Sequence, residues 1–234
     1  MLLPPGTVRA HQAIPISPEE LRHLRVRRAE DGEAVRVCDG HGAVAEGRLE
    51  YVGQSAVVHL GENEDVPAPT PLILAVGAGD RERFGWLVEK AAELGVTEIV
   101  PLDTVRARDA STRLRTGQVE RLTRRAREAL KQCAGAWAPV VHSPVPLETF
   151  LAGARPGQKW VADRAGPWPT GVLIDAPITV AVGPEGGFTA DERDGLAAAG
   201  YRPMRLAASV LRFETAALVA AAHMSMQRRR GHDE

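Results

Sequence analysis

The sequence has little cysteine, few aromatic residues and no long apolar run. Its two cysteines, Cys38 and Cys133, lie far apart in the chain, so neither a disulfide framework nor a zinc ribbon is predicted. No run approaches the roughly 18 apolar residues of a membrane-spanning helix. The first residues lack the pattern of an export signal, a basic segment followed by an apolar one. We therefore expect a cytoplasmic protein with no membrane partner.

Motifs for common cofactors are also missing. The sequence contains neither G-x-G-x-x-G nor G-x-x-x-x-G-K-[ST], which disfavours a nicotinamide enzyme and a triphosphate site. The seven histidines show no H-E-x-x-H spacing, and we expect no metal.

The 234 residues divide into two parts with different patterns. In the first part, β-branched runs lie at residues 34–38 and 55–60, and turn signals lie at residues 39–42 and 61–63. Three prolines within residues 67–71 then predict a stiff connector. We expect a small β domain at residues 1–70 and a second domain at residues 71–234.

The second part alternates strands with helices. Strands are predicted at residues 72–76, 97–100, 140–141, 160–162, 178–182 and 204–207, and helices at 84–94, at 119–133, after 189 and at the C-terminal end. This alternation is typical of an α/β fold with a largely parallel sheet.

Basic residues gather in one segment, although the net charge of the chain is only −1. Nine basic and three acidic residues lie between Arg106 and Lys131. The apolar stripe of the predicted helix at 119–133 includes Cys133 and leaves Arg121, Arg124 and Arg125 on the opposite face. Such a face fits a phosphate backbone, and it also fits a merely solvated surface.

A glycine-rich loop follows the predicted strand that ends at Val182. Its sequence is Gly183-Pro184-Glu185-Gly186-Gly187-Phe188, and a capping box with Thr189 and Glu192 opens a helix directly after it. Open α/β sheets bind ligands at the carboxyl ends of their strands, where glycines let backbone N–H groups approach. The loop therefore predicts a ligand site, with a simple tight turn as the alternative. Glu185 would either orient a ligand or bond within its own turn.

Three ordered motifs give a resemblance to a known family. They are this loop, the later run Leu211-Arg212-Phe213-Glu214-Thr215-Ala216-Ala217 and the upstream helix-strand run Val88-Glu89-Lys90-Ala91-Ala92-Glu93-Leu94-Gly95-Val96-Thr97-Glu98-Ile99-Val100-Pro101-Leu102. Together they resemble the RsmE family of bacterial 16S ribosomal RNA (uridine-N3) methyltransferases, of the SPOUT class. Residues 23–28 and Asp39-Gly40 are similar to the N-terminal domain of that family. In the later motif, the family often has Thr where this chain has Phe213.

The resemblance implies a fold and a set of partners. It implies a C-terminal, trefoil-knotted α/β domain of the SPOUT type with a largely parallel sheet, and a small PUA-like β-barrel domain that contacts RNA. It further implies a homodimer that acts on small-subunit ribosomal RNA, in the assembled subunit. RNA contacts would come from Arg25, Arg27, Arg121, Arg124 and Arg125. S-adenosylmethionine would be bound by Val182, Gly183, Pro184, Glu185, Gly186, Gly187, Leu206, Ala207, Ser209, Val210 and Leu211, without a metal.

The implied reaction is transfer of a methyl group from S-adenosylmethionine to N3 of a uridine. Arg212 would stabilise the anion that develops on the uracil oxygens, unless it is only a surface arginine. Glu214 would be either the base or a charge at the start of the terminal helix. Residues 216–222 of that helix are apolar and would form either a dimer contact or the domain core. A non-enzymatic RNA-binding protein of ribosome assembly is the alternative function.

Overall fold

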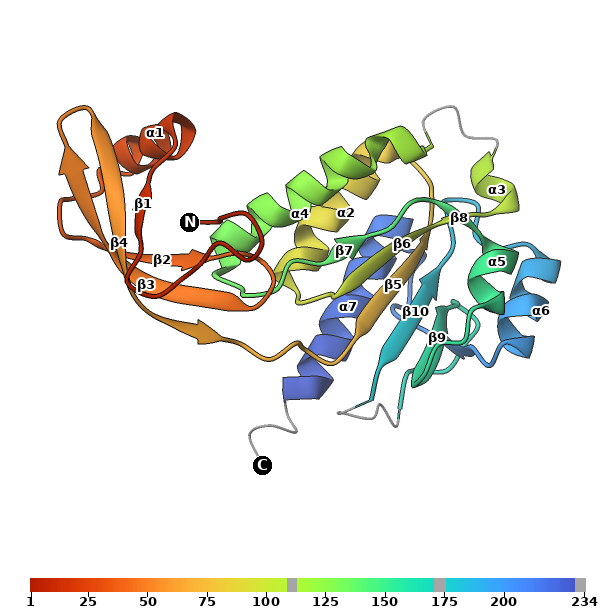
Figure 1. The fold of residues 1–234 in the computed structure, drawn as a ribbon. Coiled ribbons are helices and arrows are strands. Elements are labelled where there is room, and N and C mark those ends of the chain that lie inside the picture. The colour runs from red at the N-terminus through yellow and green to blue at the C-terminus, as the bar shows by residue number, and fades with distance from the viewer. Residues whose placement is uncertain (109–112, 171–175, 230–234) are drawn as a thin grey trace. The chain divides into compact units, whose positions relative to one another are not determined.

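The computed structural model describes residues 1–108, 113–170 and 176–229. The chain divides into two compact units, each with its own core (Figure 1). The first unit contains Met1–Ala68 and also Leu130–Ala138. The second contains Pro69–Ala129 and Pro139–Glu234. The composition of the sequence gave no sign that residues 130–138 return to the first unit, where Leu130 packs against Cys38 and Val44.

The first unit is a four-stranded antiparallel sheet with one helix. Its elements are β1 (Ala13–Pro15), α1 (Pro18–Val26), β2 (Ala34–Cys38), β3 (Ala43–Val52) and β4 (Ser55–Asp65), and the strand order is β1-β4-β3-β2. Alternate residues such as Val37, Leu49 and Val58 face the core, as expected for a sheet with one wet face.

The turn predicted at residues 61–63 is wrong, because β4 continues to Asp65. Its long pairing with β3 passes an irregularity between Ala45 and Gly47. A Cβ atom on Gly47 would lie 2.5 Å from Val58 Cγ1. Because Ala45 pairs with Asn63 and Gly47 pairs with Leu60, Gly61 lies in a strand at this irregularity. Glycine is common at such positions as well as in turns.

The second unit is a parallel sheet with helices on both faces. Its strands are β5 (Leu72–Gly77), β6 (Glu98–Asp103), β7 (Val140–Val141), β8 (Val145–Pro146), β9 (Gln158–Ala162), β10 (Ile178–Val182) and β11 (Arg202–Met204). Its helices are α2 (Arg81–Glu93), α3 (Val105–Arg108), α4 (Val119–Cys133, of which the residues from Leu130 belong to the first unit), α5 (Leu147–Ala152), α6 (Ala190–Ala198) and α7 (Phe213–Arg229), with a 3-10 turn at Thr116–Gln118. The order is β11-β9-β10-β5-β6-β7, β8 also pairs with β6, and all these pairs are parallel.

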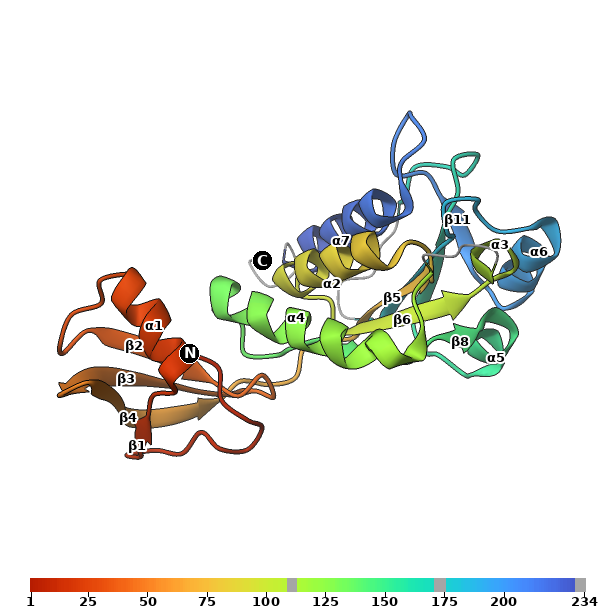
Figure 2. The same cartoon turned by 90° about the horizontal axis from the view of Figure 1, so that it is seen from above.

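Alternation along the central strands builds two hydrophobic cores. In β5, Leu72 and Leu74 face the core formed with α2, α4 and α7, whereas Ile73 and Ala75 face the core formed with α5 and α6. Figure 2 shows these two groups of helices on opposite sides of the sheet. A run that is buried on both faces reads as continuously apolar, which is why β5 and β10 were recognisable in the sequence.

Two sequence predictions fail at the ends of elements. The strand predicted at residues 204–207 is β11 and ends at Met204, because the N–H of Arg205 turns away and donates to Pro167 O. Leu206 and Ala207 therefore lie in a loop. Cys133 is exposed at the end of α4 and does not extend its apolar stripe. The knot stays a prediction, since strand order alone does not define it.

Candidate functional site

A cavity of about 450 Å³ opens at the carboxyl ends of three neighbouring strands. Its walls come from the segments that follow β9, β10 and β11, which lie side by side in the sheet. The lining includes Val182, Gly183, Pro184, Glu185, Gly187, Leu206, Ala207, Ser209, Val210, Leu211 and Arg212. Two loops that are distant in sequence and were predicted to bind one ligand thus face one cavity.

The loop after β10 is a tight turn held by the backbone. The N–H of Gly187 donates to Pro184 O over 2.8 Å, and Gly187 adopts a φ of 69°. Glycine reaches this left-handed region without steric cost. The capping box is present as predicted, with Thr189 and Glu192 each accepting the backbone N–H of the other.

Close packing of backbone leaves no room for a side chain at Gly183 of this loop. A Cβ atom on Gly183 would lie 2.9 Å from Gly187 Cα and 3.0 Å from Phe188 N. A Cβ atom on Gly77, at the end of β5, would collide with the backbone nitrogen of Pro184. The glycines therefore do more than punctuate the chain, because they bring the backbone of the loop against β5 and the cavity.

Glu185 does not bond within its own turn, which was one of the two roles considered from the sequence alone. Its Oε1 accepts the N–H of Asp80 over 3.1 Å, so it bonds to the loop between β5 and α2 and not within its own turn. The carboxylate also lies against Gly79, where a Cβ atom would collide with it. Glu185 still lines the cavity, and its contact with Asp80 joins two loops at the carboxyl end of the sheet.

Arg106 fastens the outer side of the glycine loop. Its guanidinium donates to Gly186 O, and to Phe188 O over 3.4 Å. Gly186 does not line the cavity, because a Cβ atom there would point at the Arg106 side chain, 3.0 Å from Cδ. Glu192 accepts the N–H of Val105 over 2.8 Å and thereby ties the start of α3 to the start of α6.

The loop after β11 forms the opposite wall. Leu206 and Leu211 pack their side chains partly against the core beneath α7, whereas Ser209 and Val210 are exposed. Every residue of this loop that was predicted to bind the cofactor lines the cavity.

Arg212 lies at the cavity and is exposed. Its carbonyl accepts the N–H of Ala216 and so begins α7. Within the described part of the chain, its guanidinium makes no hydrogen bond or ion pair, so all its donors face solvent or a ligand. The next residue, Phe213, is buried and stacks on Phe84 with ring centroids 6.4 Å apart. Phe213 thus anchors the start of α7 in the core.

Glu214 is buried, with 6% of its surface exposed, in the first turn of α7. Among the described residues, its Oε2 has no hydrogen-bond partner, and the carboxylate does not line the cavity. A carboxylate at a helix N-terminus is favoured by the helix dipole, but an unpaired buried oxygen costs free energy.

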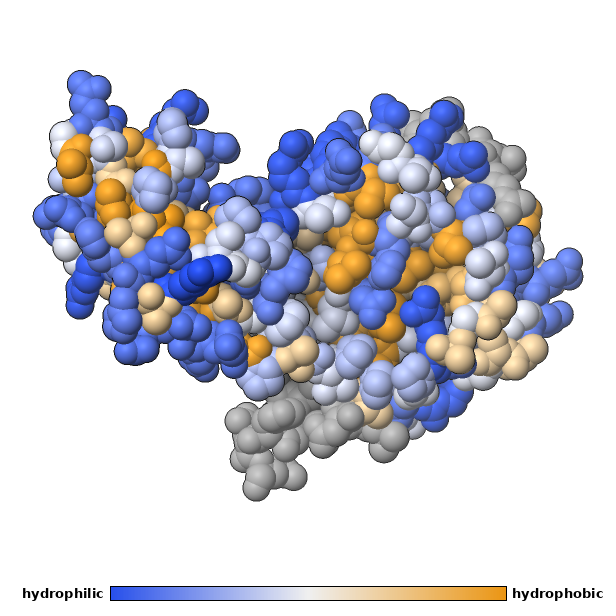
Figure 3. Space-filling view, viewed as in Figure 1, coloured by the Kyte–Doolittle hydropathy of each residue, from blue (hydrophilic) through white to orange (hydrophobic). Residues whose placement is uncertain are grey.

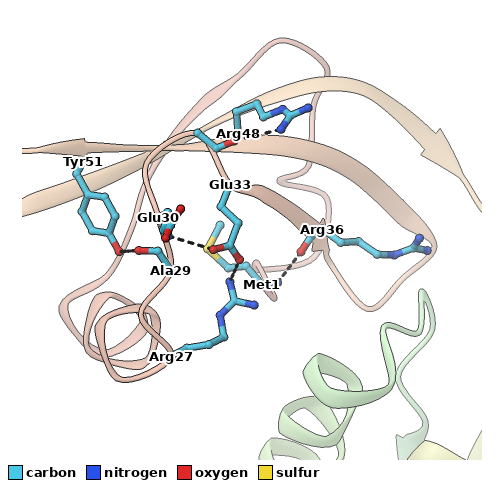
Figure 4. A network of polar contacts seen from close by, with 9 residues as sticks. Met1, Arg27, Ala29, Glu30, Glu33, Arg36, Arg48 and Tyr51 are labelled. Carbon is cyan, nitrogen blue, oxygen red and sulfur yellow. Dashed lines mark hydrogen bonds and ion pairs between the residues drawn. The ribbon is translucent and has the colours of Figure 1, made fainter.

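The predicted RNA-contact arginines differ in their surroundings. Arg121 and Arg124 are exposed on α4, over which hydrophilic side chains gather in Figure 3. Arg125 is only partly exposed and lies against Gly85 of α2, so it does not share their free face. In the first unit, Arg25 donates to Gln54 O over 2.8 Å. Arg27 forms a 2.6 Å ion pair with Glu33 (Figure 4).

Sequence reasoning missed part of the lining. Val161, Ala162, Asp163 and Arg164 follow or end β9, and Phe188 and Arg193 also reach the cavity. The strand itself was predicted, so its carboxyl end was a signal. The sequence did not show that β9 lies between β10 and β11 in the sheet. Asp163 and Arg164 were therefore not predicted as site residues.

The described residues offer no other obvious chemistry. Within them, no group of three His, Cys, Asp or Glu side chains is placed to hold a metal ion. Likewise, none of the helices in the described ranges is both long and apolar enough to cross a bilayer.

Comparison with known proteins identifies the family. The profile of the RNA methyltransferase domain matches residues 66–225, and that of the RNA methyltransferase PUA domain matches residues 16–58. The ribosomal RNA small subunit methyltransferase E of Synechocystis sp. is 30% identical over 226 residues, which cover 91% of this chain and 72% of that protein. The chain belongs to the ribosomal RNA small subunit methyltransferase E family.

Solved structures share the fold. The methyltransferase E of Neisseria gonorrhoeae, solved with S-adenosylmethionine, has a TM-score of 0.83 at 24% identity and covers 96% of this chain, with 95% of its own covered. A methyltransferase structure from Legionella pneumophila with the same cofactor has a TM-score of 0.79 at 26% identity, with 96% of each chain covered. The family and the predicted α/β domain with a PUA domain are therefore confirmed, whereas the knot stays a prediction.

Proposed function

We propose that this chain transfers a methyl group from S-adenosylmethionine to N3 of a uridine in small-subunit ribosomal RNA. One observation carries the proposal: a cavity at the carboxyl ends of β9, β10 and β11, walled by the glycine-rich loop and the loop after β11, in a chain of the methyltransferase E family. Such an RNA substrate would place the protein in the cytoplasm.

The residues around the cavity fit S-adenosylmethionine. Its volume of about 450 Å³ lies within the usual range of small-molecule sites. Gly183 and Gly187 leave backbone groups uncovered, and a Cβ atom at Gly183 would fill space that the turn itself needs. We infer that the cavity-lining residues of the two loops hold the cofactor, namely Gly183, Pro184, Glu185, Gly187, Leu206, Ala207, Ser209, Val210 and Leu211. When bound, the cofactor supplies a methyl group on a sulfonium, an activated donor that needs no metal.

Arg212 is suited to stabilise the reacting uracil. Methylation at N3 removes the N3 proton, and negative charge spreads onto the two uracil oxygens. A guanidinium stays charged at any physiological pH and donates two parallel hydrogen bonds. Arg212 lies at the cavity with its guanidinium free of internal partners among the described residues, so it can meet that charge as it develops.

Glu214 remains the second catalytic candidate. Its Oε2 is buried and unpaired within the described residues, and Phe213, its neighbour in the chain, lines the cavity. An acceptor held without a partner is available to a donor that arrives with the substrate. We propose that it either accepts the N3 proton or fixes a group that does.

RNA binding is proposed for α4 and α1. Arg121 and Arg124 are exposed and can meet phosphates directly. Arg25 and Arg27 carry their charge at the end of α1, although each also has an internal partner. Arg125 lies against α2 and contacts no phosphate directly in this proposal. Its positive charge still adds to the electrostatic attraction of RNA by α4.

A homodimer is proposed through α7. One side of this helix is core, whereas Leu218, Val219 and Ala222 are only partly buried and Met226 is 61% exposed. An apolar helix face that one chain leaves partly uncovered is suited to contact with a second copy of the helix.

The decisive experiment follows tritiated methyl groups. The protein is incubated with labelled S-adenosylmethionine and either assembled small subunits or naked ribosomal RNA, and the nucleosides are then separated. We expect label in 3-methyluridine, with subunits the better substrate. Gly183→Val is the matched control and should bind no cofactor. Label in a different nucleoside would refute the N3 assignment, and RNA binding without cofactor binding would favour the non-enzymatic alternative.

A further inference from the structure

Two loops at the rim of the cavity are joined to each other. The N–H of Arg205 donates to Pro167 O over 2.7 Å, and its Nε donates to Arg164 O over 2.9 Å. The N–H of Asp163 donates to Met204 O over 2.9 Å. Figure 2 shows the loops after β9 and β11 projecting from the same end of the sheet. Residues 163–168 and 205–212 therefore form one continuous rim, which we call the β9–β11 rim.

Large apolar side chains of this rim are exposed to solvent. Trp168 is 56% exposed, the most of the four tryptophans, and Val210 is 76% exposed. The guanidinium carbon of Arg205 lies 5.9 Å from the centre of the Trp168 ring, within the range of a cation–π contact. Trp168 does not line the cavity, but Leu206, the neighbour of Arg205, does. The ring is therefore held close to the cavity and outside it.

The charge of the rim is mainly positive. Arg164 and Arg212 line the cavity, and Arg205 lies beneath the exposed tryptophan. The one acidic side chain of the rim, Asp163, accepts the N–H of Ala165 over 2.8 Å and is used within its own turn. An exposed aromatic ring among arginines matches a nucleic acid strand, whose bases stack and whose phosphates are anionic.

We propose that Trp168 is a stacking platform for an unpaired base of the RNA substrate, next to the nucleotide that enters the cavity. The proposal rests on the function proposed above and adds a binding position that lies outside the cofactor cavity. Arg205 fixes the Trp168 ring, and Arg164 meets a phosphate next to the reacting nucleotide, while Arg212 keeps its role at the uracil oxygens. A base can stack there only when it is unpaired, so the substrate segment is single-stranded at this point.

The test compares two substitutions at one position. Trp168→Leu keeps an apolar side chain and removes the aromatic face, whereas Trp168→Phe keeps a smaller aromatic face. Binding of a fluorescein-labelled oligouridylate is measured by anisotropy, and cofactor binding by calorimetry. We expect Trp168→Leu to weaken oligonucleotide binding by roughly tenfold or more and Trp168→Phe to retain most of it. Cofactor affinity should stay unchanged in both variants.

A strand without bases isolates the stacking contribution. On an abasic oligomer of equal charge, wild type and Trp168→Leu should bind equally, because the phosphates still meet the arginines. Equal loss on both strands, or no loss on oligouridylate, would overturn the platform. A change in oligomeric state of Trp168→Leu would instead assign the ring to a protein contact and would also overturn it.

Failure of the proposed function would look different. If wild type binds the cofactor but labels no ribosomal RNA, the methyltransferase assignment fails while the oligonucleotide comparison still decides the platform. If wild type methylates RNA and Trp168→Leu keeps both its kcat/KM for RNA and its oligonucleotide affinity, the platform fails alone.

Discussion

Arg212 shows how one side chain acquires a role from its position. Its backbone starts α7 and its guanidinium stays free of internal partners among the described residues, beside the cavity. We expect Arg212→Ala to lower single-turnover methylation on the order of 100-fold, the usual effect of removing one charge-stabilising donor. Cofactor affinity measured by calorimetry should change little. Arg212→Lys should recover part of the rate, and a rate within a few-fold of wild type for Arg212→Ala would disprove the assignment.

Asp39 is a buried carboxylate that supports the first unit. Burial raises its pKa, but hydrogen bonds from the backbone N–H groups of Gly6, His41 and Ala43 outweigh burial and lower the pKa below its ordinary value of 3.8. A carboxyl whose pKa is lower in the folded state stabilises the fold above the unfolded pKa. That contribution is lost as the pH falls through the folded pKa.

We therefore expect Asp39→Asn to reduce the free energy of unfolding at pH 7 by about 2 kcal/mol, because an amide cannot accept all three bonds as an anion does. Urea unfolding at a series of pH values measures this loss. The difference from wild type should shrink below about pH 4, where the Asp39 carboxyl of the unfolded chain takes up a proton, and should be lost once the pH falls through the lower pKa of the folded state. The exposed Asp65→Asn serves as the control, and an equal loss at every pH would contradict the explanation.

Among the elements, α3 has a larger effect than its four residues suggest. Arg106 holds two carbonyls of the glycine loop, and its stem packs on Gly186. We expect Arg106→Ala to weaken cofactor binding roughly tenfold, the effect of losing a charged hydrogen bond. Arg106→Lys keeps the stem and one donor and should lose less. Calorimetry gives both affinities, and an unchanged value for Arg106→Ala would show that the turn holds its shape alone.

The exposed face of α4 is tested through salt. Arg121→Gln combined with Arg124→Gln should weaken RNA binding and make the log–log salt dependence shallower by roughly one unit per lost phosphate contact. Arg125→Gln is the comparison, because Arg125 lies against Gly85 and should change the slope less. Cofactor affinity should stay constant throughout. An unchanged salt dependence in the double variant would show that this face of α4 is only solvated and contacts no phosphate.

Elements were predictable where local pattern and tertiary environment agree. The buried run at residues 178–182 has the bounds of β10, and Thr189 caps α6 as the capping box indicates. The prediction failed where contacts distant in sequence decide. The N–H of Arg205 donates to Pro167 O, and β11 therefore ends before the predicted residue. Pairing with β3 continues past a bulge, and β4 therefore extends through Gly61. Strand order, which places Asp163 and Arg164 at the cavity, had no local signal.

At the scale of the whole molecule, the proposed dimer is the main prediction. Met226 is exposed on α7, so Met226→Glu should be tolerated by the isolated chain. If α7 is the contact, charge repulsion and desolvation should shift the protein to monomer in sedimentation experiments, and methylation should fall with it. Met226→Leu should remain dimeric. A Met226→Glu variant that sediments like wild type would place the contact elsewhere.

The position of β10 has a consequence for how the chain is made. β10 lies between β9 and β5, and Ile178 pairs with Leu72, 106 positions earlier in the chain. During translation the edge of β5 therefore waits unpaired while more than a hundred residues emerge, and pairing of such distant strands is intrinsically slow. The glycine loop and the β11 loop follow later still. The donor cavity is thus among the last features to form, and a nascent chain that has not passed β10 cannot yet compete with finished enzyme for its cofactor.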